Sequence, residues 1–120
     1  MGYGRQFIDA VYGCLIGGAV GDSLGAATEG LYHEDIERVY GRVKDLMPNP
    51  VSYSNGMVGA VTDDTVVRHL ICNAIADKGG RITPEDFARV LLRKLDTTRV
   101  WVNEEIVKKR LEAGINPWGA

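Results

Sequence analysis

Four consecutive residues with short, oxygen-bearing side chains, Thr62-Asp63-Asp64-Thr65, form the group best suited to chemistry in this sequence. Carboxylate and hydroxyl oxygens are ligands that favour hard cations such as Mg²⁺, Mn²⁺ and Ca²⁺ over zinc. Mg²⁺ takes about six oxygens in near-octahedral geometry and usually keeps several waters. The tetrapeptide therefore predicts part of a metal shell, which water, a ligand or further protein has to complete.

The two aspartates also have a simpler explanation. Acidic residues favour the first turn of a helix, where they complement the helix dipole and cap free amides. Three features favour the metal site: Thr65 adds a second hydroxyl, the preceding loop is rich in glycine, and another segment carries the acidic residues Asp22 and Glu29. The same dipole keeps the two aspartates ionised, as metal ligands must be.

Asp22 and Glu29 lie seven residues apart, so on one helix they would project from the same side, two turns apart. Glu29 is the better candidate for a free carboxylate that acts as a base beside a metal site. Asp22 is expected to be a supporting residue, satisfied by backbone amides or orienting a neighbour. His33 and His69 lie nearby in sequence, but a lone histidine is more often a surface or packing residue.

The elements that position these residues are predicted to be helices, because apolar residues recur at helical spacing and period-two alternation is lacking. We therefore expect an all-α fold, with helices over about residues 6–27, 34–40, 63–78, 84–96 and 104–114. Start signals are Thr62, the run Thr83-Pro84-Glu85-Asp86 and Asn103. Residues 47–56 predict a turn-rich loop leading to the metal motif, and Val58–Val61 is the only weak strand candidate.

Glycines recur at every fourth position of the first predicted helix, at Gly13, Gly17, Gly21 and Gly25. Each costs the helix about 1 kcal/mol relative to alanine, so their alignment on one face indicates that something approaches the backbone closely there. A second helix packed on this face is the simpler interpretation. The alternative is that the face also approaches a ligand.

Composition narrows the class of protein. The 120 residues fit one domain, with 45% hydrophobic and 25% charged residues as in ordinary globular proteins. A net charge of −2 and scattered basic residues provide no stripe for a nucleic acid backbone, so we expect no nucleic acid partner. The longest apolar stretch, Val11–Gly21, is too short to span a membrane, so a cytoplasmic protein is expected. Cys14 and Cys72 have apolar neighbours and predict buried, reduced thiols.

Two segments carry a resemblance to a known family. The run Gly13-Cys14-Leu15-Ile16-Gly17-Gly18-Ala19-Val20-Gly21-Asp22-Ser23-Leu24-Gly25-Ala26-Ala27-Thr28-Glu29, followed by Val61-Thr62-Asp63-Asp64-Thr65, resembles the amino-terminal motifs of the ADP-ribosylglycohydrolase family. The resemblance implies an all-helical domain that binds two Mg²⁺ or Mn²⁺ ions and hydrolyses N- or O-glycosidic bonds at the anomeric carbon of ADP-ribose, attached to proteins or small molecules.

The same resemblance implies roles for individual residues. Thr62, Asp63 and Asp64 match metal ligands, and Glu29 matches an acidic residue at the end of the first helix that in some members covers the site and serves as the acid or base. Asp22 matches the family's Gly-Asp step and, like Thr65, is expected to support the site.

The sequence also departs from the family pattern. Family domains are more than twice as long, and their second metal cluster, an Asp-x-Asp-Ser/Thr motif, has only a poor counterpart in Asp96-Thr97-Thr98. We therefore expect residues 1–120 to be the amino-terminal part of such a domain, completed by another polypeptide, with Trp118 in a loop that enters further structure. The alternatives are an inactive remnant, a site assembled between copies, and a noncatalytic module that binds ADP-ribose or a protein. The substrate and its leaving group stay open.

Overall fold

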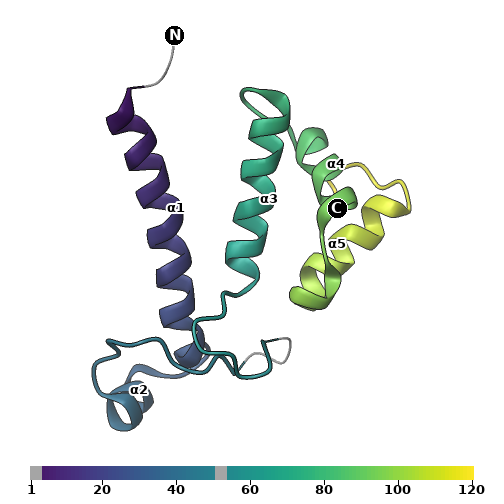
Figure 1. Cartoon of the computed structure of the whole chain (residues 1–120). Helices are drawn as coiled ribbons and strands as arrows, with labels where there is room; N and C mark the ends of the chain where they lie inside the picture. The colour runs from purple at the N-terminus through teal and green to yellow at the C-terminus, as the bar shows by residue number, and fades with distance from the viewer. Residues whose placement is uncertain (1–3, 51–53) are drawn as a thin grey trace. The chain divides into compact units, whose positions relative to one another are not determined.

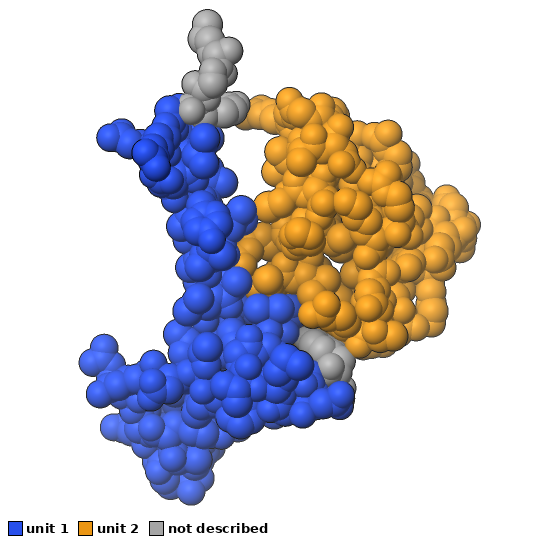
Figure 2. Space-filling model, viewed as in Figure 1, with its two compact units in different colours: residues 1–62 blue, residues 63–120 orange. Residues whose placement is uncertain are grey.

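The computed structural model describes residues 4–50 and 54–120, and the chain divides into two compact units, Met1–Thr62 and Asp63–Ala120 (Figure 2). Within the described residues, the secondary structure is helical and no strand forms, which confirms the expected all-α class. The first unit contains α1 (Arg5–Gly25), the 3-10 helix η1 (Ala26–Thr28) and α2 (His33–Tyr40) (Figure 1). The second contains α3 (Asp63–Lys78), α4 (Pro84–Lys94), η3 (Thr97–Arg99) and α5 (Val102–Glu112).

Helix α1 is long and mostly exposed. Ser23 is its only fully buried residue, at 4% exposure, and Cys14 is exposed rather than buried as expected. The helix passes directly into η1, where the Thr28 hydroxyl donates to the Gly25 carbonyl at 3.0 Å. The segment that was expected to be one helix over residues 6–27 is therefore a helix with a tighter last turn.

The segment Arg5–Thr28 also meets the length and composition expected of a membrane-spanning helix. An 18-residue stretch within it has a mean hydropathy of 1.3, and 6% of that stretch is buried. The expectation that no such segment exists was based on the shorter run Val11–Gly21, and it is wrong on these two criteria because the helix extends further in both directions. Core helices of soluble proteins and signal sequences meet the same criteria.

A polar network holds the loop that follows α2. Asn49 is 1% exposed. Its side-chain Nδ2 donates to the Ala60 backbone carbonyl at 3.2 Å, and its backbone carbonyl accepts from the Ser54 hydroxyl at 2.7 Å. Val58 forms an isolated bridge with Pro48, so the weak strand candidate is not a strand. These pairings of buried polar groups hold Asn49 to residues 54 and 60, in the described part of this loop.

Helices α3 and α4 pack together in the second unit, and α5 packs against α4 (Figure 1). Six buried apolar residues form the core: Leu70, Ala74, Val90, Leu91, Leu95 and Val100. Helix α4 begins at a full capping box, in which Thr83 and Asp86 each accept a hydrogen bond from the backbone of the other. This start was predicted from the sequence, and the structure confirms it.

The last helix differs from the prediction at its start. Its N-cap is Trp101, without a side-chain cap, and Asn103 already lies inside the helix. Val100 is buried in the core and Trp101 has extended backbone, so packing places the helix start two residues earlier than the polar signal indicated. The helix ends at Glu112, two residues before Gly114. The glycine stop signal itself is confirmed, since Gly114 has φ +82° and the amide of Ile115 donates to the Arg110 carbonyl at 3.0 Å.

The loop after α5 folds back onto its own unit. The Trp118 indole N–H donates to Glu85 Oε1 at 3.0 Å, although the residue stays 77% exposed. Hydrogen bonds from the Thr83 hydroxyl, the Glu85 backbone and Trp118 hold the pKa of Glu85 below its usual value.

Candidate metal centre

Asp22 and Thr62 form the central contact of the site, across 40 residues of sequence. The backbone amide of Thr62 donates to Asp22 Oδ2 at 3.0 Å, and the Thr62 hydroxyl donates to Asp22 Oδ1 at 2.6 Å. Thr62 is 4% exposed, and Asp22 is half-buried near the end of α1. One carboxylate therefore holds both the backbone and the side chain of the residue that precedes the two aspartates.

The hydrogen bond to Asp22 limits how the Thr62 hydroxyl can interact with other groups. A hydroxyl has one proton and two acceptor lone pairs, whereas an ionised carboxylate only accepts. Because the proton is directed at Asp22, the oxygen can act toward any other group only as an acceptor or a ligand. A threonine in this position fits a hard-cation shell as a neutral oxygen ligand.

Asp63 and Asp64 are the first two residues of α3, where they lie in the field of the helix N-terminus. Asp63 and Thr65 are half-buried and Asp64 is exposed. Among the described residues there is no group of three or more His, Cys, Asp or Glu side chains that could hold a metal ion. The motif thus offers two carboxylates and a hydroxyl, a donor set that fits Mg²⁺ or Mn²⁺ held with several waters and further oxygens.

Glu29 follows η1 and is exposed, in the same unit as Asp22 and Thr62. Gly30 comes next with φ +76°, a conformation that suits glycine, so the chain turns sharply beside this carboxylate. His33 lies at the surface, with Nδ1 3.2 Å from Glu34, and gives no sign of a catalytic role.

Sequence reasoning missed Asn49 and Gly59, which support the approach to Thr62. Gly59 has φ +76°, and a Cβ there would lie 3.3 Å from Leu46 Cδ1, so a larger residue would be both strained and crowded. An asparagine between two prolines and a glycine three residues before the motif were the available signals.

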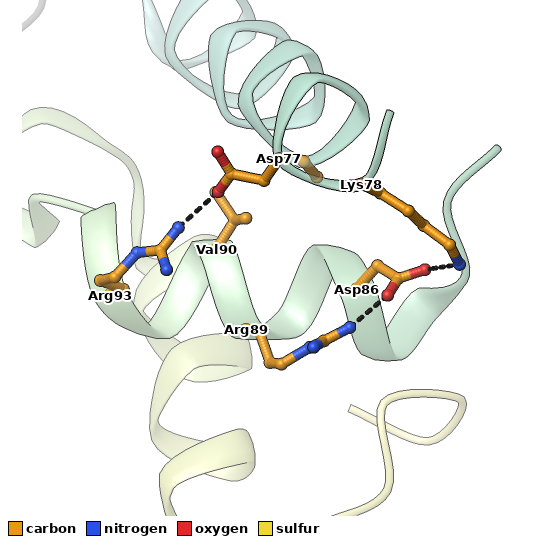
Figure 3. A pocket seen from close by; sticks show the side chains of 7 residues that line it. Asp77, Lys78, Asp86, Arg89, Val90 and Arg93 are labelled. Atoms are coloured by element: carbon orange, nitrogen blue, oxygen red, sulfur yellow. Dashed lines mark hydrogen bonds and ion pairs between the residues drawn. The ribbon is translucent and has the colours of Figure 1, made fainter. Parts of the chain in front are cut away.

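A hollow of about 340 Å³ lies in the second unit, between the end of α3 and α4, and is lined mainly by charged residues (Figure 3). Asp77 pairs with Arg93 at 2.6 Å, and Asp86 pairs with both Lys78 and Arg89. The hydrogen bond from Lys78 is the main reason that the pKa of Asp86 lies well below its usual value. Each of these charged side chains is held in an ion pair, so the cluster ties two helices together.

A second hollow in this unit, of about 490 Å³, extends from Thr65 along α3 to Arg99 and includes His69. Two of its polar groups already have partners. Lys94 donates to Asn73 Oδ1 at 2.7 Å. Asp96 Oδ1 accepts from the backbone and hydroxyl of Thr98 at 3.0 and 2.6 Å, which lowers the pKa of Asp96. Asp96 therefore caps η3. This role agrees with the expectation that Asp96-Thr97-Thr98 is a poor counterpart of the second metal motif.

Most of the chain matches one protein family. A family profile described as ADP-ribosylglycohydrolase matches residues 4–117. A curated protein of Archaeoglobus fulgidus, described only as uncharacterized, is 40% identical over 80 residues, which make up 67% of this chain. The aligned region is 25% of that relative, so the chain spans about a quarter of its length. No solved structure matches the chain.

Proposed function

Because this chain belongs to the ADP-ribosylglycohydrolase family, we propose that it is one component of a Mg²⁺- or Mn²⁺-dependent hydrolase that cleaves a glycosidic bond at the anomeric carbon of an ADP-ribosyl or related ribosyl group. Membership of the family indicates a glycosyl hydrolase. The metal dependence, the substrate and the need for a second polypeptide are the proposed parts.

The contact between Asp22 and Thr62 carries the proposal, because it builds a supported hydroxyl ligand immediately before two consecutive aspartates. Thr62, Asp63 and Asp64 would hold the metal ions. A bound metal ion supplies a Lewis acid that lowers the pKa of water and orients hydroxyl groups. Glu29, on the same unit as Thr62, would move a proton to or from the reacting oxygen as charge develops at the anomeric carbon.

We propose a complementing polypeptide or segment for three reasons. Half of the expected metal shell has no counterpart in the sequence, and the aligned relative is about four times longer than the region it shares with this chain. Helix α1 also leaves large apolar side chains exposed, including Ile8 at 58%, Tyr12 at 67% and Ile16 at 48%. Burying such residues is favourable by about 25 cal/mol for each Å² removed from water, so this helix has surface to offer a partner.

Hydrolysis by the natively purified protein tests the proposal. Peptides that carry ADP-ribose on arginine or on serine are incubated with Mn²⁺, with Mg²⁺ or with EDTA, and release of ADP-ribose is followed by chromatography. We expect release only with a divalent cation, and loss of release after Asp63→Asn and Asp64→Asn together. Release that survives both EDTA and the two substitutions would exclude the proposed mechanism.

A noncatalytic module that binds ADP-ribose or a protein is the alternative, and the incomplete metal shell favours it. Such a module would bind ADP-ribose without cleaving ADP-ribosyl peptides, and EDTA would leave the affinity unchanged. Calorimetric titration of the protein with ADP-ribose, with and without EDTA, separates the two functions, because the hydrolase component would lose affinity when its metal ions are removed.

A further inference from the structure

The hollow that extends from Thr65 along α3 to Arg99 has more basic than acidic side chains. Its lining includes His69, Lys94 and Arg99 but a single carboxylate, Asp96. In the other hollow of this unit, shown in Figure 3, every charged side chain is held in an ion pair. Among the residues that the structure describes, no ion pair involves Lys94 or Arg99. The two hollows therefore differ in what they can offer an anion.

Lys94 is held in place by a neutral group. Its ammonium donates to Asn73 Oδ1 at 2.7 Å, and Asn73 Nδ2 in turn donates to the His69 carbonyl at 2.8 Å. An ammonium has three N–H donors, so the bond to Asn73 uses one of them. Because the amide carries no charge, Lys94 can form a charge-assisted hydrogen bond to an anion without giving up an ion pair.

Arg99 is exposed at the end of η3, whose first turn is capped by Asp96. Hydrogen bonds from Thr98, and to a smaller extent the charge of Arg99, lower the pKa of Asp96. Within the described ranges, the Arg99 guanidinium makes no hydrogen bond of its own. A guanidinium has five N–H donors in a planar fork that matches the oxygens of a phosphate group.

The size and place of the hollow fit part of an elongated ligand. Its volume of about 490 Å³ lies in the range of about 300–1,000 Å³ that is usual for small-molecule sites. Val66 and Leu70 give it an apolar wall. It begins at Thr65, the residue after Asp64, and Asn73 lies about 12 Å farther along the helix axis, at about 1.5 Å per residue.

We propose that this hollow binds the phosphate groups of the ribosyl substrate, and that Lys94 and Arg99 contact them. The identity of the ligand rests on the proposed function, because an ADP-ribosyl group carries a diphosphate next to the ribose that the metal ions would hold. The binding of phosphate groups rests on the hollow alone. A free phosphate has the same chemistry, so the experiment has to distinguish it from the substrate.

Titration of the full ¹⁵N-labelled chain with ADP, followed through its amide NMR signals, tests the proposal. EDTA is present throughout, so that no metal ion contributes to binding. Adenosine is the matched ligand without phosphate, and inorganic pyrophosphate is the matched ligand without a nucleoside. We expect ADP to shift the signals of residues 69, 73 and 94–99, adenosine to leave them nearly unchanged, and pyrophosphate to bind more weakly than ADP.

Substitutions show whether the two cations are responsible. Lys94→Gln with Arg99→Gln should weaken ADP binding about 10-fold or more, because each removes a hydrogen bond between charged groups. Arg42→Gln with Lys44→Gln removes the same two charges at exposed positions of the first unit and should leave the affinity unchanged. Glutamine at position 94 can still donate to Asn73, and urea unfolding shows whether the fold is kept. Arg99→Gln alone serves if the double variant does not fold.

Four results would overturn the proposal: no shift of these signals with ADP, equal shifts with adenosine, equal affinity for pyrophosphate and ADP, or equal losses in the two double variants. The test is independent of the proposed hydrolysis. Binding of ADP as expected, without release of ADP-ribose from peptides in Mn²⁺, would overturn the hydrolase and keep the phosphate site. Release in Mn²⁺ without binding of ADP in EDTA would overturn the phosphate site alone.

Discussion

At the residue scale, the candidate site is organised around the hydrogen bond that the Thr62 hydroxyl donates to Asp22. The Thr62 hydroxyl lies 2.6 Å from Asp22 and immediately precedes Asp63 and Asp64. Thr62 is buried and Asp22 half-buried, whereas Asp64 is exposed, so these residues differ in their access to water. A hard cation that keeps several waters fits this asymmetry.

Replacing both aspartates tests the ligand assignment. Paramagnetic Mn²⁺ bound at the motif should selectively broaden the amide NMR signals of residues 62–65. Asp63→Asn together with Asp64→Asn should abolish this broadening, because neutral amides are much weaker ligands than carboxylates. The helix should still form, which circular dichroism can show. Asp9→Asn with Asp45→Asn removes the same two charges at exposed positions and should leave the broadening in place; loss of broadening there too would mean general attraction to an acidic surface.

At the scale of elements, α4 is held by its buried face. Leu91 is 4% exposed in the core, whereas the next residue, Leu92, is 37% exposed. Leu91→Ala should lower the free energy of unfolding by about 2–5 kcal/mol, because it removes packed methyl groups and leaves a cavity. Leu92→Ala is the matched control and should cost about 0.5 kcal/mol. Urea unfolding measures both, and equal losses would contradict the described core.

The ion pairs of Figure 3 predict how the second unit responds to acid. Lys78 holds the pKa of Asp86 below its unfolded value, so the stability from this carboxylate is fully present above about pH 4 and declines as the pH falls further. Asp86→Asn should lower stability at pH 7 and flatten the loss below pH 4. Parallel curves for Asp86→Asn and the unaltered chain would contradict this role.

Local signals in the sequence were sufficient for most elements. Thr83-Pro84-Glu85-Asp86 forms the capping box that its residue types predict, and Gly114 is the stop signal after α5. The start of α5 could not be predicted in the same way, because the burial of Val100 decides it and Asn103 does not. At the candidate site, the residue types of the metal motif were visible in the sequence. The pairing of Asp22 with Thr62 joins segments 40 residues apart and required the fold.

At the scale of the whole molecule, the chain spans about a quarter of the relative that it matches, and we propose that it is part of a larger domain. Helix α1 is exposed along most of its length, and no atom lies within 4 Å of a Cβ built at Gly13, Gly17, Gly21 or Gly25. The close approach expected at this glycine face is therefore not made by the described residues of the first unit. A complementing polypeptide would account for both observations.

Substitutions of Gly17 should have opposite effects on the chain and on its complex. Gly17→Ala should stabilise the lone chain by up to about 1 kcal/mol through helix propensity, since its Cβ meets no neighbour. Gly17→Leu should fold as well but retain less of the complementing polypeptide during native purification, because a large side chain blocks close approach. Full retention by Gly17→Leu, measured beside Gly17→Ala as the control for propensity, would show that this face is not the interface.

Native mass spectrometry of the protein purified in the presence of Mn²⁺, with a denaturing spectrum beside it, tests the central claim most directly. The account predicts a complex of this 13.1 kDa chain with a second polypeptide that carries an Asp-x-Asp-Ser/Thr motif and retains Mn²⁺. It also predicts that Asp63→Asn with Asp64→Asn loses the ions and keeps the partner. A lone chain without Mn²⁺ would contradict the two-part metal-dependent hydrolase and favour a binding module or an inactive remnant.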